Sequence, residues 1–157
     1  MTRGWPARLA SEWMLVEIPT SEDQRGALCI AEANRHVPFS IERVYWIYDV
    51  PGDARRGCHS HLTVEELVIA VAGEFTVHCD NGVECATIRL DDPSRGLLVG
   101  SGVWRELDMF SPGSVCLVLA SGPYAEDEYV RDYPIFSALA KSRRFLDSEA
   151  DPRSHDR

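Results

Sequence analysis

Residues 55–73 read RRGCHSHLTVEELVIAVAG, a short histidine-bearing segment followed by a continuous apolar run that ends at a glycine. Along an extended strand side chains alternate, so His59 and His61 share one face, with Cα atoms about 6.5 Å apart, and Ser60 takes the other. Buried imidazoles each need hydrogen-bond partners. They are suited to moving protons or holding a metal ion near neutral pH. The alternative is a pair of surface histidines at the mouth of a strand, and the surrounding residues favour the functional interpretation.

Short segments bounded by turn signals make up most of the chain. Besides the histidine strand, strands are expected over 13–18, 27–32, 41–49, 67–72, 74–79, 83–90, 96–99, 103–110 and 114–121, with a turn-rich loop over 20–26. Along 41–49, alternation puts Arg43 and Tyr45 on one face and Tyr48 on the other. Many short strands with regular turns predict an all-β sandwich or barrel.

The end of the chain carries the one helical pattern. Asp132 is suited to cap a helix over 133–146, and Tyr133, Phe136 and Leu139 give this helix an apolar stripe. A short C-terminal helix is therefore expected beside the β-strands.

The length of 157 residues suggests one domain, large enough to enclose a substantial core. We expect this domain to span 13–146. It would follow a flexible N-terminal arm over 1–12 and precede a charged, disordered tail over 147–157.

Composition restricts the classes of partner and the cellular compartment. The net charge of −9 argues against nucleic-acid binding, which usually needs a basic patch. No apolar run approaches the roughly 20 residues of a membrane span, and no signal-peptide pattern is present. The five cysteines are odd in number and form no Cys-x-x-Cys pair, so a reduced cytoplasm is the expected location.

The histidine segment resembles the first motif of the cupin family. That motif consists of a glycine-rich approach, His-x-His, a following Glu and a closing Gly, which correspond here to Gly57, His59, His61, Glu65 or Glu66, and Gly73. The resemblance implies a jelly-roll, or double-stranded β-helix, barrel.

The second cupin motif corresponds to residues 100–105, where Arg105 stands in place of the last metal-binding His of the family. Arginine stays protonated and has no lone pair for a metal. We therefore expect the histidines to be acid–base groups and no metal to be bound. A site of two histidines and one carboxylate remains an alternative.

Within the cupins, the chain is similar to the sugar-nucleotide 3,4-ketoisomerases. The matching blocks are residues 23–26, 38–39, 43–48, 55–61, 102–106, 115–121 and 124–133, in the family's order. Departures include Ser60 for an Ala, Leu62 for a basic residue and Glu66 for a Gln, together with Gly100-Ser101 for Pro-Pro. None of these departures removes a histidine, so they affect the identity of the substrate more than the reaction type.

The resemblance implies an isomerase (an intramolecular oxidoreductase) that moves the keto group of TDP-4-oxo-6-deoxy-α-D-glucose from C4 to C3, in a pathway to a 3-amino-deoxy sugar. The proton shift through an enediol needs a base with a pKa near 7, an oxyanion stabiliser and a proton donor, but neither metal nor redox cofactor. His59 and His61 would supply base and shuttle in either order. Arg43, Tyr45 or Tyr48 would stabilise the enolate.

Binding of a sugar nucleotide needs cations in a fork geometry for the diphosphate. The candidates in or beside the matching blocks are Arg25, Arg43, Arg56 and Arg105. Trp104 or Tyr45 would stack on the thymine ring, and Tyr48 is a further candidate for substrate binding. Glu65 and Glu66 are interpreted as rim or salt-bridge residues.

Other functions remain open at this point. A TDP-sugar 3,5-epimerase also begins at C3, a metal cupin such as a dioxygenase would need a metal, and a non-catalytic cupin would bind the nucleotide sugar without turnover. The resemblance also implies a homodimer with exchanged N-terminal strands. Family members deliver either the gluco or the galacto 3-oxo sugar.

Overall fold

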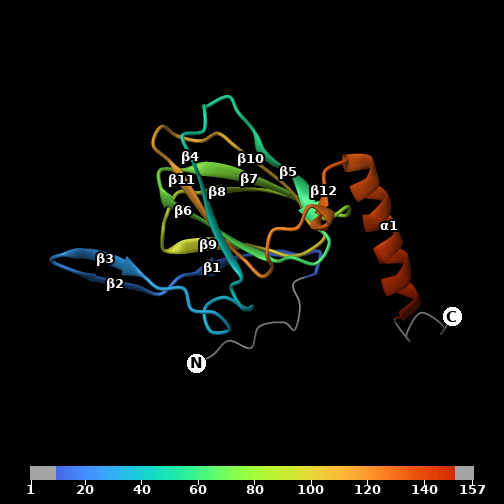
Figure 1. The fold of residues 1–157 in the computed structure, drawn as a ribbon, viewed down its shortest axis with the longest axis horizontal. Helices are drawn as coiled ribbons and strands as arrows, with labels where there is room; N and C mark the ends of the chain where they lie inside the picture. Colours follow the sequence, from blue (N-terminus) through green and yellow to red (C-terminus); the bar gives the residue numbers. More distant parts are fainter. Residues whose placement is uncertain (1–9, 151–157) are drawn as a thin grey trace.

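Two five-stranded antiparallel sheets face each other and form the body of the molecule in the computed structural model, which describes residues 10–150 (Figure 1). The first sheet contains, in spatial order, β1 (Trp13–Glu17), β9 (Arg95–Val99), β6 (Glu66–Ala72), β11 (Val115–Ala120) and β4 (Arg43–Tyr48). The second contains β12 (Tyr129–Val130), β5 (Arg56–His61), β10 (Trp104–Asp108), β7 (Phe75–Asp80) and β8 (Cys85–Leu90). This arrangement confirms the predicted all-β jelly-roll class.

The core lies between the sheets because alternate side chains of each strand point inward. On β7, Phe75 and Val77 are buried, and on β6 the buried Val68 and Ala70 face the same core. Leu67 and Ile69 point to the opposite face of β6, where a second buried cluster covers them. This double coverage explains why the apolar run of β6 shows no alternation.

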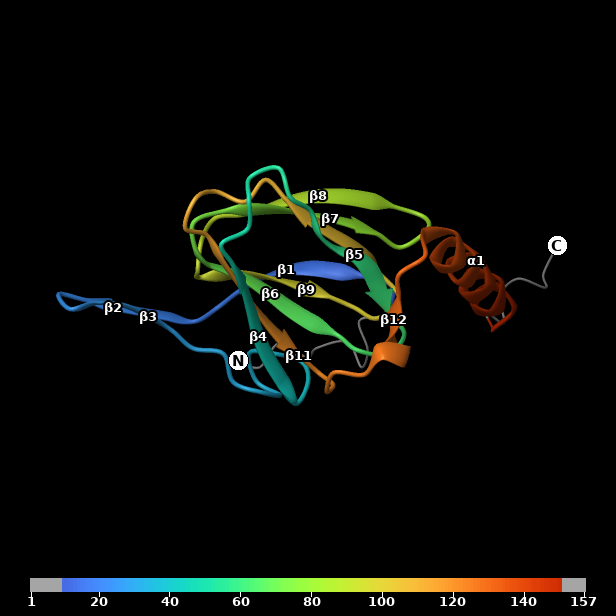
Figure 2. The same cartoon turned by 45° about the horizontal axis from the view of Figure 1, so that its top comes forward.

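A hairpin of β2 (Thr20–Asp23) and β3 (Gly26–Cys29) extends away from the barrel (Figures 1 and 2). All eight strand residues are exposed. The expectation of a loop over 20–26 is therefore wrong. Backbone pairing creates these strands although their residues have low strand propensity, and the Asp23 carboxylate stabilises the turn by accepting a hydrogen bond from the Arg25 N–H at 2.8 Å.

Helix α1 (Tyr133–Ala150) begins where the sequence predicts, and the Ile135 N–H donates to the capping Asp132 carboxylate at 3.0 Å. Phe136 and Ala140 pack against the outer face of the second sheet, whereas Tyr133 and Leu139 of the expected apolar stripe are exposed.

The helix continues past the expected end at Leu146 because residues 147–150 contain no glycine or proline. The remainder of the predicted tail and residues 1–9 of the predicted arm lie outside the described residues. Within 10–150, no helix has the length and apolar character needed to cross a membrane.

Candidate active site

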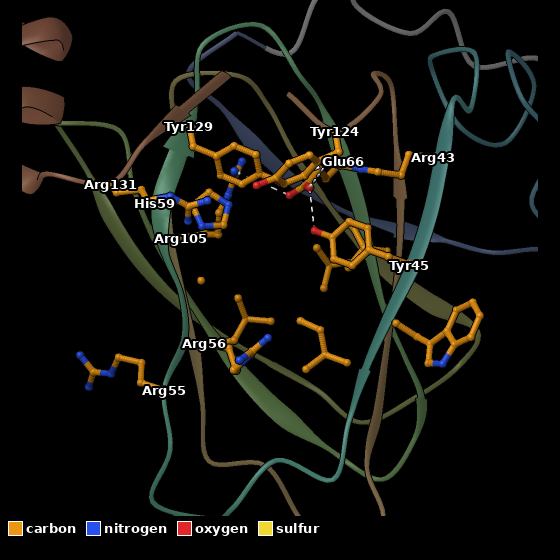
Figure 3. A pocket seen from close by; sticks show the side chains of 16 residues that line it. Arg43, Tyr45, Arg55, Arg56, His59, Glu66, Arg105, Tyr124, Tyr129 and Arg131 are labelled. Atoms are coloured by element: carbon orange, nitrogen blue, oxygen red, sulfur yellow. Dashed lines mark hydrogen bonds and ion pairs between the residues drawn. The ribbon is translucent and has the colours of Figure 1, made fainter. Parts of the chain in front are cut away.

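A cavity of about 520 Å³ lies between the two sheets, a size suited to a small organic ligand (Figure 3). Strands from both sheets and the irregular segment before α1 line it. The lining residues are Arg43, Tyr45, Trp46, Ile47, Arg55, Arg56, Gly57, His59, Glu66, Val68, Arg105, Leu107, Val118, Tyr124, Tyr129 and Arg131. The cavity is therefore lined by polar and charged side chains around a few apolar ones, Ile47, Val68, Leu107 and Val118.

A β-bulge in β5 sets the direction of the two histidines. His59 pairs with Arg105 and Gly57 with Glu106, so Cys58 is the extra residue of the bulge. Gly57 and Cys58 have φ values of +78° and +57°, and a Cβ on Gly57 would lie 2.8 Å from the carbonyl oxygen of Arg105. Glycine is thus required there by both conformation and space.

The histidine rings lie on the same side of the sheet, as alternation predicts. Their centroids are 4.9 Å apart with the planes at 80°, and both rings contact Tyr129. Cys58 points to the opposite side, against the cluster that includes Trp104 and Phe136. His59 lines the cavity, whereas His61 is 1% exposed and lies behind it.

Burial decides the protonation of the rings. Burial, with help from the Arg105 guanidinium, lowers the pKa of His59 to about 4. Burial also lowers the pKa of His61, although contact with Glu66 opposes the shift. His59 is therefore neutral at physiological pH and has a lone pair that can accept a proton, although its pKa lies below the value near 7 expected for the base.

Glu66 lies at the centre of a buried charge cluster. The Tyr45 hydroxyl donates to its Oε1 at 2.8 Å, and His61 Nε2 lies 3.3 Å from the same oxygen. Arg43 and Arg105 approach the carboxylate to 3.8 and 3.7 Å. Burial alone would raise the pKa of Glu66, but Arg105, His61 and Tyr45 outweigh it and hold this pKa well below its usual range. Burial, followed by the charge of Glu66, raises the pKa of Tyr45 far above its usual range.

Two guanidinium groups present spare hydrogen-bond donors at the same end of the cavity. The Nε atoms of Arg43 and Arg105 are buried and have no hydrogen-bond partner in the structure. Nη2 of Arg43 and Nη1 of Arg105 also form no hydrogen bond, although both face the Glu66 carboxylate as ion pairs. Arg43 also donates through Nη1 to the Tyr129 hydroxyl at 3.3 Å. Because unpaired buried donors are costly, these groups form a site prepared for an anionic oxygen.

Three residues expected to bind substrate lie elsewhere in this chain. Trp104 precedes Arg105 on β10, so alternation turns its ring toward α1, where it packs on Phe136. Tyr48 occupies the outer face of β4 and is exposed. Arg25 is exposed on the hairpin, where it pairs with Asp23.

The rim of the cavity carries residues to which the sequence interpretation gave no role. Arg55, Tyr124 and Arg131 lie there with the expected Arg56, and all four are exposed. Arg131 stacks 4.3 Å above the Tyr129 ring and pairs with Glu126. Tyr129 lies on the short strand β12, Tyr124 comes before it and Arg131 directly after it, and alternation does not predict the path of this segment. In the sequence, only the resemblance of residues 124–133 to the family indicates that this segment contributes to the site.

The cavity floor corrects one further expectation. Glu66 is not a rim residue, because it is 2% exposed, although its interpretation as an ion-pairing residue is accurate. Within the described residues, no group of three His, Cys, Asp or Glu side chains could hold a metal ion.

Comparisons with known proteins agree on one family. The family described as "FdtA: WxcM-like, C-terminal" matches residues 11–141. The chain is 43% identical over 114 residues to the TDP-4-oxo-6-deoxy-α-D-glucose-3,4-oxoisomerase of Aneurinibacillus thermoaerophilus. The matched region covers 73% of this chain and 82% of that protein.

Solved structures give the same result. The sugar 3,4-ketoisomerase QdtA of Thermoanaerobacterium thermosaccharolyticum, in complex with TDP, is 38% identical with a TM-score of 0.82, covering 83% of this chain and 96% of that one. A 3,4-ketoisomerase of Helicobacter canadensis is 36% identical with a TM-score of 0.80, covering 82% and 97%. A 3'-monoepimerase of Streptomyces bikiniensis, 14% identical with a TM-score of 0.65 over 74% of this chain and 67% of that one, shares the fold alone.

Proposed function

The chain belongs to the sugar 3,4-ketoisomerase family, and on this premise we propose that it moves the keto group of TDP-4-oxo-6-deoxy-α-D-glucose from C4 to C3. The family predicted from the sequence is confirmed. One observation carries the proposal: the neutral His59 ring faces a cavity in which the Arg43 and Arg105 guanidiniums present unpaired donors. A base opposite an anion-stabilising group is what enolisation requires.

His59 is proposed as the catalytic base. It takes the proton from C3, the electrons of the C–H bond form a C3–C4 double bond, and charge develops on the C4 oxygen. Arg43 and Arg105 stabilise that oxygen before it is protonated. Loss of the C3 hydroxyl proton then forms the C3 carbonyl while C4 receives a proton, so reactant and product have the same composition.

Tyr45 has a different role from the expected one in this scheme. Its single hydroxyl proton is donated to Glu66, so it does not serve the oxyanion in this arrangement. His61 lies behind His59 and serves the proton shuttle rather than direct contact with substrate.

The diphosphate is proposed to bind at the rim. Arg55 and Arg56 lie there, at the end of the cavity away from His59 (Figure 3), and guanidinium groups match phosphate oxygens in pairs. Figure 3 shows Arg55 and Arg56 toward one end of the cavity, and His59, Glu66 and Tyr45 toward the other. A sugar held between these ends would bring C3 and C4 to the histidine while the charged linkage stays near solvent.

Proton NMR of the purified protein with TDP-4-oxo-6-deoxy-glucose in D₂O tests the function. Deuterium at C4 with the carbonyl at C3 is the expected result, and the C4 couplings give the gluco or galacto configuration. Deuterium at C3 and C5 with the carbonyl still at C4 would instead identify a 3,5-epimerase. Tight binding without exchange would identify a non-catalytic sugar-binding cupin.

A homodimer with exchanged N-terminal strands is the proposed assembly. The exposed β2–β3 hairpin and the exposed outer face of edge strand β4, which carries Trp46 and Tyr48, support it, since such surfaces are usually covered. Arg25 would then reach a substrate only as part of the partner's site. Light scattering that gives the mass of a monomer would contradict this assembly.

The cytoplasm is the proposed location. All five cysteines of the chain are free thiols in the structure, which suits a reducing compartment.

A further inference from the structure

The cavity lining includes a buried carboxylate to which the reaction scheme gives no role. Glu66 is 2% exposed and contacts His61, Tyr45 and two guanidinium groups. The negative charge of this side chain therefore lies within a buried cluster that includes one of the two site histidines. We propose that Glu66 is a positioning residue that keeps the ring proton of His61 on Nε2 and increases the proton affinity of that ring.

The contacts at Oε1 support the tautomer. An ionised carboxylate only accepts hydrogen bonds, so the Tyr45 hydroxyl must donate to it at 2.8 Å. His61 Nε2 lies 3.3 Å from the same oxygen. A proton on Nε2 faces the anion favourably, whereas a proton on Nδ1 would leave the Nε2 lone pair against the carboxylate. The Nε2–H form is therefore favoured.

The charges around His61 support the increase in proton affinity. The titratable or charged groups that face the ring are Arg43, His59, Glu66, Arg105, Glu128 and Tyr129. The two arginines oppose protonation, and Glu66 is the carboxylate in direct contact with the ring. Without its charge, no carboxylate in direct contact with the ring would offset the two guanidiniums, and the pKa of His61 would fall further.

The two histidines are affected unequally. For His61, the contact with Glu66 at 3.3 Å is the strongest influence on the pKa that opposes burial. For His59, the charge of Glu66 is the weakest of the contributing influences. The carboxylate thus makes His61 the better proton carrier of the pair. If the proposed function holds, this chain keeps its proton donor to higher pH than the same site with glutamine.

The test is a pH titration of the histidine rings by ¹⁵N NMR in the free protein. Spectra of His59→Asn and His61→Asn assign the two rings. We compare wild type with Glu66→Gln, which keeps the size of the side chain and removes its charge. The matched control is Glu65→Gln, at the neighbouring position outside the cavity lining.

In wild type we expect the Nε2–H tautomer of His61. In Glu66→Gln we expect its midpoint to fall by about one to three pH units, and the midpoint of His59 to fall by less. Glu65→Gln should leave both unchanged. An Nδ1–H tautomer in wild type, or an unchanged His61 midpoint in a folded Glu66→Gln variant, would overturn the proposal.

A second variant keeps the test decisive if Glu66→Gln does not fold. Tyr45→Phe removes the hydroxyl that shares Oε1, so the full charge of the carboxylate acts on His61 and the midpoint should rise. An unchanged or lower midpoint would overturn the proposal.

The proposal rests on the proposed function only for its role in turnover, and the titration needs no substrate. A shifted midpoint in a protein that shows no C4 exchange would contradict the function alone. In an active enzyme, the alkaline limb of kcat/KM should move to lower pH in Glu66→Gln. An unshifted limb together with an unchanged midpoint would contradict the role of Glu66 alone.

Discussion

The rings of His59 and His61 meet edge to face with centroids 4.9 Å apart, yet His59 lines the cavity while His61 is 1% exposed behind it. Two histidines that look equivalent in the sequence therefore have unequal surroundings. Of the two rings, His59 lines the cavity and His61 contacts the buried Glu66. Such separation of two titratable groups by environment is a common basis for distinct acid and base roles.

Replacement of His59 by Asn should remove the catalytic base and keep the shape of the site. We expect kcat for deuterium incorporation at C4 to fall by about 10²–10⁴-fold, the usual contribution of a positioned general base. Exchange is measured by NMR in D₂O and binding of TDP by calorimetry, with affinity expected to change little. The control is His78→Asn, on the outer side of the sheet, where His78 contacts Asp108 at 2.9 Å. Equal exchange rates in the two variants would exclude His59 as the base.

Replacement of Gly57 by Ala should damage the bulge that directs the histidines. The left-handed conformation costs an alanine about 1–2 kcal/mol. The new Cβ would also lie 2.8 Å from the Arg105 carbonyl oxygen, a contact that forces the backbone to move. We therefore expect the free energy of unfolding to fall by about 3 kcal/mol or more, measured by urea denaturation.

The matched control is Gly113→Ala. Gly113 has a similar φ of +74°, but nothing lies within 4 Å of its added Cβ. The control should show the conformational cost alone. Equal losses of stability would mean that close packing at the bulge has no energetic role.

Strand alternation predicts the side of the sheet on which the site residues lie better than their positions in the family blocks do. It correctly placed His59 with His61 and Arg43 with Tyr45. Trp104 and Arg105 are adjacent in one family block, but alternation requires them to face opposite sides, and only Arg105 reaches the cavity. Tyr48 had likewise been placed opposite Tyr45. The two-residue period of a strand therefore predicts that neither Trp104 nor Tyr48 faces the cavity.

The remaining parts of the site depend on tertiary structure. Glu66 begins β6 in the other sheet, so its approach to His61 depends on how the two sheets face each other. Tyr129 lies on β12, whose pairing with β5 joins residues distant in sequence, and Arg131 directly follows that strand. A single sequence contains no local signal for such relationships.

Replacement of Arg105 by Met should destabilise the folded protein. Arg105 is 2% exposed and lies 3.7 Å from Glu66, and removal of one partner of a buried ion pair commonly costs about 3–5 kcal/mol. We expect a loss near the lower limit of about 3 kcal/mol, because Arg43 and Tyr45 still contact the carboxylate. Turnover should fall in the same variant, because Arg105 is proposed to stabilise the charge on the C4 oxygen.

A double-mutant cycle measures the coupling. Arg105→Met combined with Glu66→Gln should lose less stability than the sum of the single changes. Arg95→Met, at an exposed pair with Glu17, is the control and should change stability by no more than about 0.5 kcal/mol. Additive losses in the cycle would show that the buried pair contributes no coupling.

Acid should destabilise the protein already in the range in which histidine titrates. The pKa of His59 is lowered from 6.5 to about 4 in the fold, and that of His61 is also lowered. Between pH 6.5 and 4, the unfolded chain therefore binds protons at these rings that the native state does not bind. Stability contributed by the two neutral rings is complete above pH 6.5 and falls as the pH decreases.

Urea denaturation at steps from pH 7 to pH 5 checks this behaviour. The lowest pH of this series stays above 4.5, the ordinary pKa of Glu66. The loss of stability expected from protonation of that carboxylate therefore occurs at more acidic pH. The free energy of unfolding should fall as pH decreases in wild type, and the slope should become smaller in His59→Asn and in His61→Asn. Parallel curves for wild type and both variants would show that burial of the histidine pair does not couple proton binding to folding.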